Sequence, residues 1–198
     1  MRSCAFILAA ALALAGCGRT PQGQQQEPQQ PPQQDASAPA TTPGPDGSLP
    51  KTTITLYFPS ATDDRLVAET REIVDTARPA ERGTQVLVEL MAGPKDQGAL
   101  PAVPDGTTLR QLWIGKSGVA WADFSEELAT GQKGGSSDEL LAVYAIVDSL
   151  TANVPQIKRV GLLVAGKERD TLAGHVDIRR PLPGESKLAP APPSPPTE

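Results

Sequence analysis

The sequence predicts one α/β domain of the α+β type, in which a small mixed β-sheet carries two main helices packed on one face. Between residues 52 and 182, short runs with apolar residues at every second position are separated by longer runs with apolar residues three or four positions apart. The first spacing is typical of a half-buried strand and the second of an amphipathic helix. Because this stretch has an ordinary domain size and no internal repeat, a single domain is expected.

Four runs are predicted as strands. Residues 54–58 alternate between apolar and polar side chains and end before a proline, which indicates a strand with one buried face. Residues 160–165 are apolar at nearly every position, so this strand is expected to be central and buried on both faces. Leu109–Ile114 and Val119–Phe124 flank a Gly-Lys-Ser-Gly sequence at residues 115–118, which predicts a hairpin.

Two helices are predicted from the longer apolar spacings. Ser136 and Glu139 match a capping box, in which each side chain bonds the backbone N–H of the other residue, so a helix should begin there. A second helix should end at Gly93-Pro94, because glycine and proline both terminate helices. Residues 66–74 fit either a helical face or a strand. The apolar faces comprise Leu140, Val143, Tyr144, Val147 and Leu150 in the first helix and Val86, Leu87, Leu90 and Met91 in the second.

Residues 1–16 form a predicted export signal, with Arg2 ahead of a short apolar run and small residues at its end. The Leu-Ala-Gly-Cys sequence at residues 14–17 resembles the bacterial lipobox. We therefore expect cleavage before Cys17, acylation of its thiol with chains such as palmitate, and lasting attachment to a membrane on its non-cytoplasmic side. Gly18 follows the cysteine instead of an aspartate, which predicts the periplasmic face of the outer membrane if the cell has two membranes.

Residues 17–51 and 183–198 are predicted to be disordered. Both segments are rich in proline and poor in large apolar residues, so they cannot bury enough surface to offset the entropy of ordering. The first would act as a tether that spans on the order of 30 Å as a flexible coil. The formal net charge of -5 and the lack of a basic patch argue against nucleic acid as a partner.

Residues able to carry catalysis are few. The chain has one histidine, His175, and no cysteine follows Cys17. Because no His, Cys, Asp and Glu cluster has metal-ligand spacing, neither a metal nor another cofactor is expected. Asp123 with Glu126-Glu127 would suit glycoside hydrolysis, but Asp123 and Ser125 follow a strand, where such side chains more often fix a turn. His175 is interpreted as a structural hydrogen-bonding residue and the protein as a non-enzyme.

Several segments, taken in order, resemble the GerMN domain, the sporulation and spore-germination family found in bacterial envelope lipoproteins. Residues 54–58 resemble its opening strand, and residues 66–71 the segment that follows. Residues 93–109 are similar to its Gly-Pro sequence followed by Pro-x-Gly-Thr, and residues 121–125 to its strand that ends in Asp-x-Ser. Further matches are residues 146–151 with its helix end, residues 164–166 with its closing strand and residues 172–175 with its final loop.

This resemblance covers residues 52–181 and implies a sheet with helices on one face, similar to the ring-building modules of envelope assemblies. It also implies that residues 66–74 form a strand and that the domain has no catalytic centre. We therefore expect an interaction module that docks another envelope protein, or its own copies, near cell-wall assembly.

Two other hypotheses remain open. The domain could bind peptidoglycan or another envelope ligand in a cleft formed by Trp121, Asp123, Ser125 and His175, with Trp113 nearby. Alternatively, Asp123 and His175 could act together as the catalytic groups of an enzyme.

Overall fold

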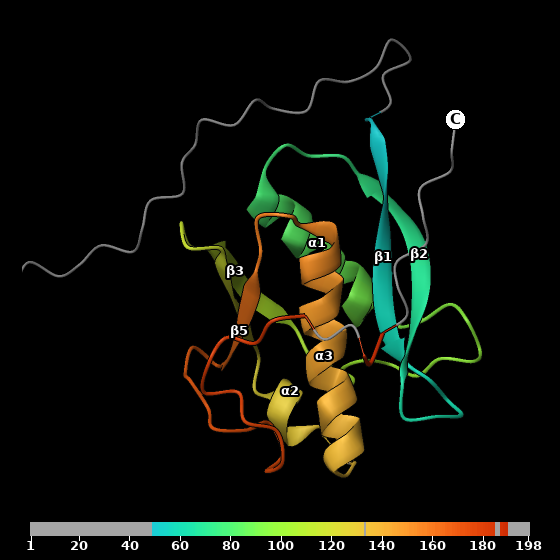
Figure 1. Ribbon diagram of the computed structural model, residues 1–198, viewed down its shortest axis with the longest axis vertical. Coiled ribbons are helices and arrows are strands. Elements are labelled where there is room, and N and C mark those ends of the chain that lie inside the picture. The colour runs from blue at the N-terminus through green and yellow to red at the C-terminus, as the bar shows by residue number, and fades with distance from the viewer. Residues whose placement is uncertain (1–48, 133, 185–186, 190–198) are drawn as a thin grey trace, which may run out of the picture. The chain divides into compact units, whose positions relative to one another are not determined.

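The structure is a computed structural model that describes residues 49–132, 134–184 and 187–189 (Figure 1). These residues form five strands and three helices in the order β1-β2-α1-β3-β4-α2-α3-β5. The predicted α/β class is confirmed, although the strands form two sheets instead of the single mixed sheet expected. The helix α3 packs against strands of both sheets. The predicted signal peptide, Cys17 and almost all of the predicted tether lie outside the described residues.

β1 (Lys51–Pro59) and β2 (Leu66–Val74) form an antiparallel sheet in which Ile54 lies opposite Arg71. The apolar residues predicted to face inward from β1 are buried. In β2, exposed residues alternate with buried or half-buried ones, and this period of two is that of a strand. Residues 66–74, whose apolar spacing alone fits either a helix or a strand, therefore form a strand, as the resemblance implied.

β3 (Leu109–Ile114), β4 (Val119–Phe124) and β5 (Arg159–Val164) form the second sheet in that order. β3 and β4 are the predicted hairpin, and β4 and β5 run parallel. The expectation that β5 is the central strand is wrong, because β4 takes that place. β5 is nevertheless buried, since α3 packs against it and Leu182 pairs with Val160 on the side away from β4.

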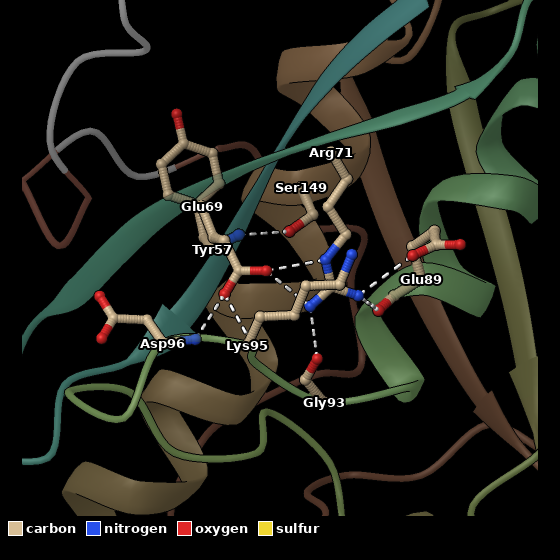
Figure 2. Close-up of polar contacts among 8 residues, drawn as sticks. All are labelled: Tyr57, Glu69, Arg71, Glu89, Gly93, Lys95, Asp96 and Ser149. Carbon is tan, nitrogen blue, oxygen red and sulfur yellow. Dashed lines mark hydrogen bonds and ion pairs between the residues drawn. The ribbon is translucent and has the colours of Figure 1, made fainter.

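α3 (Ser136–Asn153) covers the side of β1 that faces away from β2. The Asn153 side chain accepts the N–H of Thr55 at 2.8 Å and donates to the Thr55 carbonyl oxygen at 2.6 Å. The Ser149 hydroxyl accepts the N–H of Tyr57 at 3.0 Å (Figure 2). These side chains form hydrogen bonds with backbone groups of β1 that could otherwise pair with a third strand. α3 is buried over most of its length, and not only along the predicted apolar stripe.

The start of α3 differs from the predicted capping box. Gly135 is the N-cap, and the Asp138 carboxylate accepts its N–H at 3.2 Å. Ser136 is exposed, whereas only 1% of the Glu139 side chain is exposed. Because Asp138 already takes the capping position, Glu139 is available to bind a distant loop, and this contact is described below.

α1 (Pro79–Met91) is fastened to β2 by Arg71, whose side chain is 3% exposed (Figure 2). The guanidinium donates to the carbonyl oxygens of Glu89 at 2.7 Å and Gly93 at 2.5 Å, both at the C-terminal end of the helix. It also forms ion pairs with Glu69 at 2.7 Å and Glu89 at 3.1 Å. The predicted helix end is confirmed, and Gly93 has a φ of 82°, which favours glycine there.

The chain after β5 packs on the domain beyond the predicted boundary at residue 182. The Leu188 carbonyl oxygen accepts the N–H of Leu66 at 2.8 Å, at the start of β2. Leu182, Leu188 and Ala189 also pack against the hydrophobic core. Leu188 and Ala189 therefore contact the core although they lie within the segment that the sequence predicts to be disordered from residue 183. The tail from residue 190 onward lies outside the described residues.

Candidate functional site

The carboxyl ends of the parallel strands β4 and β5 lie at one edge of the second sheet, a place where α/β proteins often bind ligands. β4 leads into α2 (Glu127–Thr130), and β5 leads into residues 165–176, here named the edge loop. The edge loop begins with a tight turn in which Ala165 and Gly166 have φ angles of 52° and 77°. Three carboxylates from other parts of the domain hold this loop in place.

Asp123 is the first of these carboxylates and is 6% exposed. Its Oδ1 accepts the N–H of Gly166 at 2.8 Å, and its Oδ2 lies 3.2 Å from Nε of Arg110. Ser125 has a similar role, because its hydroxyl accepts the N–H of Thr108 at 3.0 Å. Both side chains bind backbone next to β4, which favours the structural interpretation of these residues over a catalytic one.

Glu126 is the second carboxylate, and it forms an ion pair with Arg169 of the edge loop. The neighbouring Glu127 is exposed, and a hydrogen bond from Ser125 lowers the pKa of Glu127. Glycoside hydrolysis needs one carboxyl group that keeps its proton near neutral pH. The lowered pKa of Glu127 does not suit that role, and Asp123 and Glu126 instead hold the edge loop through Gly166 and Arg169.

Glu139 is the third carboxylate and reaches the edge loop from α3. Its Oε1 accepts the N–H groups of Leu172 and Ala173, both at 2.9 Å, and its Oε2 accepts the N–H of His175 at 2.8 Å. Burial raises the pKa of Glu139, but hydrogen bonds from the loop backbone and the His175 ring outweigh it, so the pKa lies below its ordinary value. The carboxylate is therefore ionised at neutral pH and satisfied by loop donors.

His175 lies on the outer side of this contact. Its Nδ1 is 3.0 Å from Oε2 of Glu139, while 45% of its side chain is exposed. Glu139 thus orients the ring, as a catalytic histidine would require. Within the described part of the chain, however, the hydrogen bonds of this ring include none to a hydroxyl or thiol nucleophile. The contact fits the structural role expected for His175.

Trp121 lies on the outer face of the second sheet, directly opposite Trp113 in the hairpin. Both rings are half-buried. The Trp121 ring packs over Gly161 of β5, where an added Cβ would lie 2.4 Å from the ring carbon Cε3. Asp123 is two positions further along β4 and therefore on the same face as Trp121.

The four residues predicted to form a cleft occupy two neighbouring parts of the domain. Trp121 and Asp123 belong to the outer face of β4, whereas Ser125 and His175 belong to the turns beyond it. A hollow of about 440 Å³ lies elsewhere, and none of these four residues lines it. No group of three or more His, Cys, Asp or Glu residues in the described chain could hold a metal ion.

Sequence reasoning missed the part that Glu139 plays in the edge loop. The spacing of Ser136 and Glu139 matches a capping box, and that local explanation left no reason to seek another partner. The partners of Glu139 are 33 to 36 residues away in the chain, and apart from the His175 ring they are backbone N–H groups, which the sequence does not distinguish.

The fold is similar to solved structures from two bacteria. The chain is 25% identical to the first GerMN domain of the sporulation protein GerM from Bacillus subtilis, with 67% of this chain and 97% of that one covered and a TM-score of 0.56. The tandem GerMN domains of the same protein match at 25% identity and a TM-score of 0.52, with 68% of this chain and 44% of that one covered. A candidate lipoprotein from Clostridium perfringens matches at 25% identity and a TM-score of 0.50, with 69% and 89% covered.

No protein of curated function matches this chain. None of the described helices combines the length and apolar character needed to cross a bilayer. A family model, Germane, described as sporulation and spore germination, matches residues 55–170, which span β1 to the middle of the edge loop. The chain therefore belongs to the Germane family, as the resemblance to GerMN domains implied.

Proposed function

We propose that this protein is a lipid-anchored envelope protein whose Germane domain is a non-catalytic interaction module for cell-wall or envelope assembly. The edge loop is the surface that we assign to a partner, which is another envelope protein or a second copy. The observation that carries this proposal is the fastening of the loop by three carboxylates from β4, the start of α2 and α3. A loop held in one conformation loses less entropy when it binds, so it is suited to recognition.

The proposed anchor rests on the lipobox at residues 14–17 and on the similarity to the candidate lipoprotein from Clostridium perfringens. Two or more acyl chains on Cys17 would keep the domain at the membrane, because each buried methylene contributes about 0.8 kcal/mol. Fractionation of cells tests this step. We expect the parent chain with the membranes and a Cys17→Ser variant in the soluble fraction, and equal membrane retention of both would contradict lipid anchoring.

A photo-reactive amino acid at position 168 tests the interaction surface in intact cells. Glu168 is exposed in the edge loop, and Glu72 is an exposed glutamate on β2 that serves as the matched control position. We expect position 168 to capture one defined envelope protein, or a second copy, which position 72 does not capture. Adding Glu139→Gln should reduce the captured fraction of the protein that is present, because the edge loop loses part of the contact that holds it.

If positions 168 and 72 give the same capture pattern, or if Glu139→Gln leaves capture unchanged, the edge loop is not the docking surface. Turnover of a cell-wall substrate by the purified chain, lost in a folded Asp123→Asn or His175→Ala variant, would instead establish an enzyme.

A second candidate function is binding of wall glycan on the outer face of the second sheet. The observation in its favour is the cross-strand pair of Trp113 and Trp121, because partly exposed indole rings suit sugar stacking. Sedimentation of the chain with purified cell wall tests it. Retention that falls in Trp113→Ala would support wall binding, and no retention of the parent chain would remove it.

A further inference from the structure

β3 is the outer strand of the second sheet, and its edge away from β4 pairs with no other described strand. The N–H of Gly115 donates to the Val119 carbonyl oxygen at 2.8 Å, so Gly115 points its backbone groups toward β4. Backbone groups of an antiparallel strand alternate in direction, and Trp113 therefore also faces β4. Leu112 and Ile114 point their N–H and C=O groups the other way, where the described chain offers them no hydrogen-bond partner.

The regular part of this free edge is short and symmetric about Trp113. At one end, the pairing with β4 shifts between Leu109 and Gln111, a bulge that interrupts the ladder. At the other end, β3 stops at Ile114 and the chain turns. A two-fold axis through Trp113 would place Leu112 of one copy opposite Ile114 of a second copy. Each such pair exchanges two N–H···O bonds, so the axis satisfies the free groups of both residues in both copies.

An exposed row of small and apolar residues on α1 lies beside this edge. α1 packs on β3, and a Cβ added at Gly83 would lie 2.6 Å from a side chain of β3 (Figure 1). Glu89 faces β2, because it forms an ion pair with that strand. Residues four apart share one side of a helix, so Ala80, Thr84 and Val88 form a row on the flank turned away from β2. Val88 is 51% exposed, the largest exposure among the large apolar residues of the described chain.

The free edge at residues 112–114 and the row at positions 80, 84 and 88, here named the β3–α1 surface, carry no charged side chain. The chain has a net charge of -5, so two copies repel each other less at this surface than at a charged one. The axis through Trp113 brings Lys116 of one copy toward Arg110 of the other. Arg110 already lies 3.2 Å from the Asp123 carboxylate, so Lys116 meets an ion pair and not a lone cation. The surface is therefore complementary to itself.

We propose that the β3–α1 surface joins two copies of this chain in a symmetric dimer, in which the two β3 strands pair antiparallel about Trp113. The second sheet continues from one copy into the other, and the two α1 rows approach each other on the same side of this sheet. The two Trp113 rings become direct cross-strand neighbours, and such aromatic pairs are favourable. The inference goes beyond the proposed function, because β3 and α1 contribute no residue to the edge loop. Failure of one proposal therefore leaves the other intact.

Disulfide cross-linking tests the register of this dimer. The mature chain from residue 17 has no cysteine once it carries Cys17→Ser, so an introduced cysteine reports only on its own position. In the proposed dimer, the two copies of position 113 have Cα atoms about 4.5 Å apart, within the range of about 4.4–6.8 Å that a disulfide spans. We expect mild oxidation to link Trp113→Cys chains in pairs.

Gln111→Cys is the matched control for the cross-link. Gln111 lies on the same face of the same strand and is exposed. Its two copies would be about 14 Å apart, because four residues of strand, at about 3.4 Å each, separate them. We expect the Gln111→Cys chain to remain largely unlinked under the same oxidation. The urea midpoint of each variant shows whether it folds.

A pair of valine substitutions provides a second arm that leaves Trp113 in place. Sedimentation of the Cys17→Ser chain should show a dimer whose share rises with protein concentration. Val88→Asp should weaken this dimer by at least about tenfold, because it brings two like charges together at the α1 rows. Val74→Asp makes the same change at an exposed valine of β2, outside the β3–α1 surface, and should have no effect.

Three results would each overturn the dimer. The first is a chain that remains monomeric up to about 1 mM, the concentration that corresponds to a very weak association. The second is a Gln111→Cys chain that links as readily as a folded Trp113→Cys chain. The third is a Val74→Asp variant whose dimer is weakened as much as that of Val88→Asp.

Discussion

Replacing Glu139 with glutamine should lower the free energy of unfolding by about 2 kcal/mol. The native carboxylate accepts three backbone N–H groups and contacts Nδ1 of His175. A glutamine keeps one acceptor oxygen but turns an amide donor toward the N–H of His175, so at least one charge-assisted bond is lost. Such a bond contributes about 1.5–3 kcal/mol. For a domain whose total stability is about 5–15 kcal/mol, this loss is readily measured.

Alanine at the same position should cost more, about 4 kcal/mol. The N–H groups of Leu172, Ala173 and His175 would then all lose their acceptor, and each buried unpaired donor costs about 1–3 kcal/mol. The cost stays below the sum of the three because Ala173 and His175 can recruit water. Urea unfolding followed by tryptophan fluorescence gives the free energies. Hydrogen exchange should show faster exchange at these three amides first.

The pH dependence of stability provides an independent check. The folded pKa of Glu139 lies below its ordinary value of 4.5, so the unfolded state binds this proton more readily. The stabilisation is therefore fully present above about pH 5 and is lost as the pH falls through the lowered folded pKa. The Glu139→Gln variant should show a flatter loss of stability below pH 5 than the parent chain.

A matched control separates the effect of losing the Glu139 contacts from a general effect of charge. Glu168→Gln removes one charge from an exposed position of the same loop and should change stability by less than about 0.5 kcal/mol. The reasoning would be refuted if Glu139→Gln also changed stability by less than 0.5 kcal/mol, or if exchange accelerated evenly over the whole domain.

Three further predictions follow from other contacts. Arg71→Ala should destabilise the domain by about 3–5 kcal/mol, because it leaves helix carbonyls and partly buried glutamates unpaired, and a urea midpoint equal to that of the parent would contradict this. Gly161→Ala should cost about 1–3 kcal/mol and shift the fluorescence of Trp121, since the new methyl group overlaps the ring; an unchanged spectrum and midpoint would show that the ring moves freely. The hydrogen bond and charge of Arg179 lower the pKa of Asp177 to about 2, and titration by nuclear magnetic resonance should find that it rises toward 3.8 in Arg179→Ala. A pKa of Asp177 that does not change in that variant would assign the shift to another group.

The strands and helices of this domain could be predicted because their burial is periodic. Residues 54–58 alternate as a one-sided strand must, and the pairing of β3 with β4 followed from the glycine-rich turn between them. The position of β5 could not be predicted by the same reasoning. An apolar strand is expected in the centre of a sheet, but α3 and Leu182 bury this one at an edge.

The site was only partly predictable, for a physical reason. Asp123 and Ser125 bind backbone close in the fold to β4. The position of Ser125 directly after the strand indicated that role, whereas Asp123 lies within β4 and not after it. Glu139 accepts backbone N–H groups that almost any residue type would supply, so the sequence of the edge loop does not reveal that Glu139 binds this loop. Asp138, one residue earlier, performs the capping role that the spacing had assigned to Glu139.

The contacts between α3 and β1 limit how this protein can assemble through its backbone. Strands with unpaired edges tend to pair with strands of other molecules, and repeated pairing at both edges of a sheet produces fibres. In the two-stranded sheet, the edge of β1 away from β2 is already hydrogen-bonded from Thr55 to Pro59, by α3 side chains and by the N–H of Leu100. An incoming strand can therefore pair along the full length of this sheet only beside β2, so this sheet by itself cannot propagate through both of its edges.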